Sequence, residues 1–425
     1  MTGGLLQLSA IGNQDIILTG NPQITYFKNV YKRYTNFSIE SKPNLFTGEA
    51  KFGDTIECII NKSGDLLRDM YIEIELPTLK QNQTHNSTTS NYVGYVNGVA
   101  NALIESVELQ IGRQTIDKYF SDWSDIHSEL HMSESKKKLY NRMIGYFNTE
   151  GTLEKNAISH TSKTKFKRFY IPLYFWFNRN PGLSLPLIAL QYHEVSLIIK
   201  LRNINEIVKS DIALGNQILD TEGNIARINK CIVWSDYIFL DTKERRIFAQ
   251  SSHEYLIEQT QYTEKEISGE NTNIFVDLHF NHPVKSLYWI IIRNENLEIN
   301  TKTGNSIFKY SSKELSDTFD QCKLLLEGMD RFGARSADYF RTIQPYNHFK
   351  RGPNKYLYTY SFSLDANNYQ PNGTCNFSRL ESPQLSFTFD KDRGLDEGPR
   401  KIKIYAVNYN LLKITSGMAG LAYSN

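Results

Sequence analysis

Hydrophobic and polar residues alternate with a period of two through much of this chain. In the segment 70–76 the even positions 72, 74 and 76 are aliphatic, whereas Glu73 and Glu75 fall on the opposite face. This period is typical of a half-buried strand in an antiparallel sheet. The sequence therefore predicts an all-β fold, because the same alternation recurs at 107–111, 276–280, 385–389 and 401–404.

Helical periodicity is scarce. Trp123, Ile126 and Leu130 have the spacing of one helix face, and a similar pattern continues over 139–144 after a polar, lysine-rich break. Another short helix is expected to begin at Asp241, which is a suitable N-cap residue. We expect only a few short helices beside the strands.

The order of the strands occurs twice. Three blocks in the first half have counterparts in the second half: 55–60 and 70–76 correspond to 274–280 and 287–292, 107–111 and 116–119 to 322–326 and 331–339, and 169–177 and 185–201 to 356–364 and 385–389.

This order indicates a duplicated domain of about eight strands. Such a domain fits a jelly roll, which hides its sheet edges by folding two sheets over one core. The prediction is two tandem eight-stranded jelly rolls, joined near 203–230, where turn-forming residues cluster. The expected division is an N-terminal segment at 1–25, a first jelly roll at 26–210, a linker at 211–229 and a second jelly roll at 230–425.

Length and charge agree with two domains and narrow the function. A chain of 425 residues suits two β-sandwiches of about 200 residues each. The 48 basic residues are balanced by 46 acidic ones, so no overall positive field attracts nucleic acid, which argues against a genome-packaging protein. The 26 tyrosines and 23 phenylalanines suit strands and wide contact surfaces.

Four widely spaced cysteines lack the spacing of a zinc site and are too sparse for a disulfide scaffold. We interpret them as reduced, buried small side chains: Cys58, Cys231, Cys322 and Cys375. The chain starts without a secretory pattern, and the apolar stretch 169–201 is interrupted by 178–182 and by charged residues. These features predict a soluble chain made in a reducing cytosol.

A histidine pair in the sequence has a spacing that also occurs in zinc sites. His127 and His131 flank Glu129, but HSELH is neither the zinc-protease pattern HExxH nor its inverted form. We interpret this histidine pair as lying on the surface of an amphipathic helix. Phosphate-binding loops, dinucleotide-binding loops, GxSxG and the HxH of cupin metal sites are all missing from the sequence. We therefore expect no catalytic, cofactor-binding or metal-binding residue.

Two other polar features have simple interpretations. The basic run 136–138 is read as a solvated helix face, with contact to an anionic inner membrane as the alternative. Three polar segments, 78–98, 148–166 and 294–318, are predicted to be exposed loops. Within them, Asn82 and Asn86 are candidate glycosylation acceptors.

The residues 3–41, GGLLQLSAIGNQDIILTGNPQITYFKNVYKRYTNFSIES, closely resemble the amino terminus of major capsid proteins of nucleocytoplasmic large DNA viruses. The resemblance is strongest to the algal-virus and mimivirus-like branch. It continues in family order through the whole chain, at 108–114, 116–119, 181–194 (PGLSLPLIALQYHE), 234–242, 253–259, 280–283, 370–379 (QPNGTCNFSR) and 416–423. The three polar loops depart from the family pattern, so the resemblance does not say what they carry.

The resemblance implies a double jelly roll that forms homotrimeric capsomers with a pseudo-hexagonal outline, tiling an icosahedral virion shell. It places residues 1 to about 22 at the inner base of the capsomer. Expected partners there are neighbouring capsomers, minor capsid and penton proteins, and the inner viral membrane, without direct nucleic acid binding. The expected location is the virion, after assembly in the host cytoplasm as a late protein.

Two other functions fit the sequence less well. A receptor- or glycan-binding jelly roll of a spike or fibre would also be a trimer, but it would not tile and would need a stalk, which this sequence lacks. A cupin-type enzyme is disfavoured by the missing HxH motif. The preferred interpretation is a structural capsid protein without a catalytic site.

Overall fold

The computed structural model describes residues 2–79, 93–146, 166–210, 218–220, 222–268, 272–299, 306–389 and 398–423. The candidate glycosylation sites Asn82 and Asn86 lie outside these described residues, as do parts of all three predicted loops. By its internal contacts the chain separates into an N-terminal unit, residues 1–37, and a body, residues 38–425.

The N-terminal unit contains two short helices, α1 (Gly3–Ser9) and α2 (Ile16–Thr19). Neither helix has a buried residue within the chain. The unit ends where strand β1 begins, at Phe37.

The first sandwich of the body consists of two four-stranded sheets. Both are antiparallel in the pairs with assigned register. One sheet has the order β1 (Phe37–Leu45), β10 (Lys230–Leu240), β3 (Leu66–Pro77) and β7 (Phe166–Pro172). The other has the order β2 (Thr55–Ile59), β8 (Val195–Leu201), β5 (Ile104–Ile111) and β6 (Gln114–Phe120).

The second sandwich repeats this plan. Its larger sheet has the path β11 (His253–Ile267), β20 (Arg400–Thr415), β13 (Pro283–Arg293) and β17 (Tyr358–Ser361), with β18 (Cys375–Asn376) and β21 (Met418–Leu421) paired beside it. Its smaller sheet has β12 (Asn273–Asp277), β19 (Gln384–Thr388), β14 (Gln321–Leu326), β15 (Met329–Asp330) and β16 (Arg335–Ser336).

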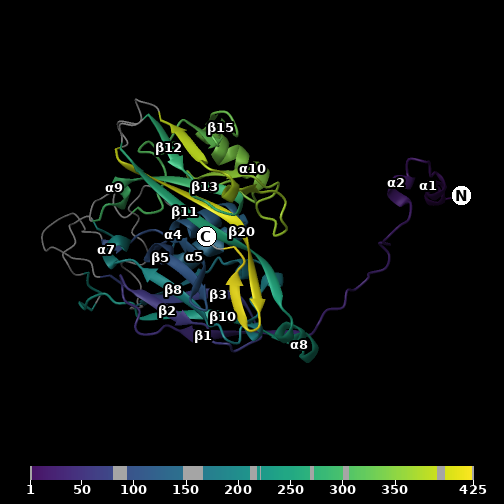
Figure 1. Ribbon diagram of the computed structural model, residues 1–425, viewed down its shortest axis with the longest axis horizontal. Coiled ribbons are helices and arrows are strands. Elements are labelled where there is room, and N and C mark those ends of the chain that lie inside the picture. Colours follow the sequence, from purple (N-terminus) through teal and green to yellow (C-terminus); the bar gives the residue numbers. More distant parts are fainter. Residues whose placement is uncertain are drawn as a thin grey trace. The chain divides into compact units, whose positions relative to one another are not determined.

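The remaining elements are short, and Figure 1 shows several of them beside the sheets. They are β4 (Val93–Tyr95), paired with β9 (Val208–Ser210); α3 (Val99–Leu103), α4 (Ser121–Leu130), α5 (Glu134–Ile144), α6 (Trp176–Arg179), α7 (Ile204–Ile207), α8 (Thr242–Gln250), α9 (Asn294–Leu297) and α10 (Gln344–His348); and η1 (Pro181–Leu183), η2 (Leu187–Ala189), η3 (Tyr339–Ile343) and η4 (Phe377–Arg379).

The period-two pattern corresponds to burial of the aliphatic face of each strand. On β3 the aliphatic residues Ile72, Ile74 and Leu76 are at most 1% exposed and belong to the core of the first sandwich. The strands β13 and β20 likewise direct Trp289 and Ile404 into a separate core in the second sandwich. The predicted all-β double jelly roll and its duplicated strand order are confirmed.

Two predicted boundaries are wrong. The N-terminal segment, predicted at 1–25, extends to residue 37 as a unit of its own. The segment 230–240 is predicted to belong to the second jelly roll, yet as β10 it lies between β1 and β3 in the first. A strand that alternates with period two fits either sandwich, and only its pairing decides which one. The join therefore lies after β10, at helix α8, where Asp65 of the first sandwich accepts a hydrogen bond from the Leu240 amide (2.9 Å) and contacts Arg245 (3.0 Å).

The placement of β10 makes a prediction about stability. Val233 is fully buried in the core of the first sandwich, so Val233→Ala should cost about 2 kcal/mol of unfolding free energy. In hydrogen exchange, the amides of β1 and β3 should lose more protection than those of β12 and β19. Lys243→Ala, on the exposed side of α8, is the control, and equal loss of protection in both sandwiches would contradict the assignment.

Candidate functional site

The two sandwiches meet at a junction built around helix α4. This helix begins directly after β6, and nearly all of its residues are buried. Trp123 of α4 packs edge-on against Tyr288 of β13, with ring centroids 5.1 Å apart, and also contacts Tyr405 of β20 at 5.8 Å. Residues of β13 and β20 therefore belong to the same hydrophobic cluster as the first sandwich. Close-packed side chains join the two sandwiches.

Three acidic residues lie along α4 at spacings of three and four: Asp122, Asp125 and Glu129, here called the acidic row. This spacing places them on one side of the helix. Each is at most 3% exposed. Buried carboxylates are costly unless they are paired, so their partners decide whether the junction is stable.

Each member of the acidic row contacts a cationic side chain of the second sandwich. Asp122 contacts Lys403 of β20, and both carboxylate oxygens of Asp125 accept hydrogen bonds from the Lys355 ammonium, at 2.8 and 2.7 Å. Glu129 contacts the Arg351 guanidinium (3.5 Å) and accepts a hydrogen bond from the Asn354 backbone amide (3.1 Å). The acidic row thus ties the helix of one sandwich to the strands and loops of the other.

The ammonium of Lys355 has an additional aromatic environment. It lies 5.1 Å from the ring centroid of Tyr146, 5.3 Å from that of Phe308 and 5.6 Å from that of Tyr310, within the range of cation–π attraction. Burial opposes the charge of Lys355, but the adjacent Asp125 carboxylate outweighs burial and raises the pKa of the lysine. Lys355 is therefore charged, and its charge is satisfied by one carboxylate and three rings.

The basic run 136–138 divides between solvent and this junction. Lys136 and Lys138 are exposed, as the interpretation of a solvated face expects. Lys137 is not: it is buried and forms an ion pair with Glu129 at 3.0 Å. Burial raises the pKa of Glu129, yet Lys137 and the other cations outweigh burial, so the net shift is downward and the carboxylate is ionised.

The histidine pair is also at the junction, which corrects the prediction of a surface pair. His127 and His131 stack with their ring centroids 4.7 Å apart. His131 is hydrogen-bonded to Asn367 (2.9 Å) and to the Tyr288 hydroxyl (3.1 Å), both in the second sandwich. The sequence identified the helix face correctly, but it gave no sign that a distant sandwich would cover that face.

The histidine environment favours neutral rings. Burial, with the positive charge of Arg179 next, lowers the pKa of His131 to about 3. Burial, followed by His131, also lowers the pKa of His127 well below its ordinary value. Among the described residues, no group of three histidine, cysteine, aspartate or glutamate side chains is arranged to hold a metal ion. The pair serves the packing of the junction.

A second ionic group closes the junction beside α6. Glu258 of β11 accepts a hydrogen bond from Arg179 of the first sandwich at 2.6 Å and another from Lys285 of β13 at 2.7 Å. On the neighbouring strand pair, the Thr260 amide donates to Asp117 of β6 at 3.0 Å. These contacts fix the orientation of β11 relative to β6 as well as their separation.

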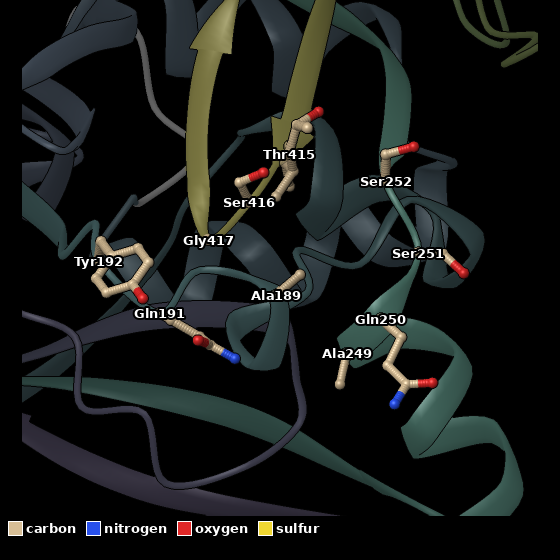
Figure 2. A pocket seen from close by; sticks show the side chains of 11 residues that line it. Ala189, Gln191, Tyr192, Ala249, Gln250, Ser251, Ser252, Thr415, Ser416 and Gly417 are labelled. Carbon is tan, nitrogen blue, oxygen red and sulfur yellow. The ribbon is translucent and has the colours of Figure 1, made fainter.

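A pocket of about 530 Å³ lies where the β20–β21 hairpin approaches the first sandwich (Figure 2). Gly417, at the tip of the hairpin, accepts a hydrogen bond from the Tyr192 amide at 3.0 Å. A side chain at Gly417 would collide with the Tyr192 ring, and its φ of +81° also requires glycine. The lining is made of alanine, glutamine, serine, threonine, tyrosine, isoleucine and glycine, without an ionisable acid–base pair.

The four cysteines are free thiols, but the prediction that all four are buried is wrong for two of them. Cys58 and Cys322 are buried, and Cys231 and Cys375 are partly exposed. Burial raises the pKa of all four thiols, which leaves them protonated and unreactive near neutral pH. Within the described part of the chain, no helix is long and apolar enough to cross a membrane.

Comparison with known families matches both halves of the chain. Residues 25–241 match the family described as "Major capsid protein N-terminus", and residues 244–420 match "Large eukaryotic DNA virus major capsid protein". The division between the two matches falls after β10, in agreement with the strand pairing.

Similar proteins include the major capsid proteins of Pyramimonas orientalis virus and Paramecium bursaria Chlorella virus 1. Each is 38% identical to this chain, over the full length of both proteins. Among solved structures, a chain in a quasi-atomic model of the PBCV-1 virus capsid has a TM-score of 0.76 at 34% identity, covering 94% of this chain and 100% of that one. The Faustovirus major capsid protein shares the fold, with a TM-score of 0.75 at 14% identity over 97% and 96% of the two chains.

The acidic row makes a prediction about stability. Lys355→Met should lower the free energy of unfolding by about 3–5 kcal/mol, because it leaves Asp125 buried without its cation. The double variant Asp125→Leu, Lys355→Met should regain most of this loss in denaturant unfolding. Lys413→Met removes an exposed pair with Glu254 and should change stability by at most about 0.5 kcal/mol. A single variant no worse than this control would refute the role of the pair.

The histidine pair makes a prediction about pH. Below about pH 6.5 the unfolded chain binds protons that the folded histidines reject, so stability should fall as the pH falls from 6.5 towards 3. His131→Gln should reduce the slope of melting temperature against pH in this window. The exposed His279→Gln should leave the slope as in the parent protein, and identical slopes for all three proteins would contradict the prediction.

Proposed function

The chain belongs to the family of large eukaryotic DNA virus major capsid proteins, and from this premise we propose that three copies close into a capsomer with a six-cornered outline. Two sandwiches of one topology in each chain give six similar corners around a three-fold axis. Such a ring can tile a hexagonal lattice. Its contacts are heterologous, one sandwich against the other sandwich of the next chain, and three-fold closure prevents an open filament.

The observation that carries this proposal is the rigid junction. A regular six-cornered outline requires a fixed angle between the two sandwiches of each chain. The shared hydrophobic cluster and the acidic row supply that constraint, because a hinge motion would separate the buried carboxylates from the lysines that pair with them. A family role as a structural capsid protein needs no bond-making chemistry, and we propose that the chain has no catalytic function.

We propose that the N-terminal unit binds other components at the inner base of the shell. Its apolar side chains are exposed: Leu5 is 55% exposed, Ile17 88% and Phe27 98%. Exposed apolar surface of this extent is a mark of interaction sites. The proposed partners are neighbouring capsomers, minor capsid and penton proteins, and the inner viral membrane, whereas the balanced charge gives no basis for nucleic acid binding.

The proposed location is the virion, with assembly in the cytoplasm of the infected cell. The raised pKa values of the four free thiols and the lack of disulfides among them suit a reducing compartment. The glycosylation of Asn82 and Asn86 stays a prediction from the sequence.

Native mass measurement tests the oligomer. The purified chain should have three times the monomer mass of 49.1 kDa, and electron microscopy should show six-cornered particles. A protein that stays monomeric at all concentrations and salt conditions used for capsid assembly would overturn the proposal. A trimer with a round, untileable head would favour a spike instead.

Deletion of residues 2–25 tests the N-terminal unit. The trimer should form with an unchanged melting temperature, because none of the helical residues in this unit is buried within the chain. Assembly of trimers into sheets or shells, followed by light scattering, should be lost. A deletion that dissolves the trimer itself would show that the unit acts within the capsomer rather than between capsomers.

A further inference from the structure

The duplicated fold presents the same sheet face twice; among the described residues, the aromatic side chains of one face are fully buried and those of the other are partly exposed. In the second sandwich, the outer face of β13 and β20 carries Tyr288, Ile290 and Tyr405, each at most 1% exposed. They are buried because helix α4 of the first sandwich packs on this face. Within one chain, therefore, the helix that follows strand β6 of the first sandwich covers a sheet of the second.

The corresponding face of the first sandwich is formed by β3, β10 and β7. By sheet order, β3 corresponds to β13 and β10 to β20. Tyr71 of β3 pairs with Trp234 of β10, as Tyr288 pairs with Tyr405. The Tyr71 and Trp234 rings stack at 6.5 Å, and Tyr170 of β7 meets Tyr71 edge-on at 6.1 Å. We call these three residues the aromatic face, and all three are partly exposed.

A charged group beside the aromatic face holds Trp234 in place. Glu73 accepts a hydrogen bond from the Trp234 indole at 2.6 Å and forms ion pairs with Lys230 (3.0 Å) and Arg168 (3.1 Å). Glu73 is only 4% exposed, so the Trp234 ring is anchored before any partner arrives. Preorganised tryptophan and tyrosine are the residues that contribute most to protein–protein affinity.

The helix that would match α4 is also present in the second sandwich. Strand β16 pairs with β14 as β6 pairs with β5, and the helical turns η3 and α10 follow it as α4 follows β6. The inner side of this helix packs on its own core through Phe340. Its outer side is uncovered, with Ile343 48% and Tyr346 86% exposed. In α4 the same outer side is buried by the other sandwich.

We propose that η3 and α10 of one copy pack on the aromatic face of the next copy, repeating between chains the contact that α4 makes within the chain. This inference rests on the proposed trimer and names its interface. Figure 1 shows α10 in the upper half of the body and β3 and β10 in the lower half, so the two surfaces do not meet within one chain. Two different surfaces on one chain are what a closed heterologous ring requires.

Two variants test the two sides of this interface. The face variant is Tyr71→Ala with Trp234→Ala, and the helix variant is Ile343→Asp with Tyr346→Asp. Each should need roughly a hundredfold higher concentration for half-maximal trimer formation in native mass measurement, as expected for removing two central aromatic or apolar anchors. Phe275→Asp, at a 47% exposed position on edge strand β12, is the control and should remain a trimer.

Mixing the two variants gives a sharper test. A chain with a defective face keeps a working helix, and a chain with a defective helix keeps a working face. The mixture should therefore form heterodimers with one intact contact, while neither variant alone forms dimers. This outcome cannot arise from misfolding, and melting curves of each variant provide a second check.

The possible results separate this inference from the proposed trimer. If the parent protein is a trimer and the helix variant is equally trimeric, the interface is assigned wrongly and the trimer stands. If the parent protein is a monomer, the proposed function itself fails. If the face variant melts early because Trp234 also contacts Glu73, the helix variant decides alone, since Tyr346 is almost fully exposed in the single chain.

Discussion

The pairing of buried charges between helix α4 and the second sandwich is the constraint on which the rest of the structure depends. Asp122, Asp125 and Glu129 are stable inside the protein only when Lys403, Lys355 and Arg351 reach them from the other half. Removing one partner would leave a desolvated charge, which costs several kcal/mol. A purely apolar junction would tolerate sliding, whereas these pairs are satisfied in one arrangement only.

Because the two sandwiches of one chain have a fixed orientation, copies of the chain can form a regular larger assembly. The duplicated jelly roll buries its sheet edges and presents equivalent outer faces on both halves. One face is covered by α4, and the equivalent aromatic face is partly exposed. The proposed capsomer follows from repeating one contact three times within chains and three times between them.

The body and the N-terminal unit also differ in how far their apolar side chains are buried. The body keeps its apolar side chains in two cores, whereas residues such as Ile17 and Phe27 of the N-terminal unit are exposed. A segment of this composition gains free energy only by binding elsewhere. In a family of capsid proteins, that suits a contact between the capsomer and its surroundings, separate from the contacts that close the ring.

The sequence by itself determined the strands, their duplication and the family, because period-two alternation and strand order are local properties of the chain. It placed α4 and identified its histidine face. Only the tertiary structure decided that β10 closes the first sandwich, since an alternating strand has no intrinsic partner. Likewise, only the tertiary structure places His131 and Lys137 at the junction, because a sandwich distant in sequence covers their helices. Such packing between distant segments does not produce a periodic pattern in the sequence of the residues that it buries.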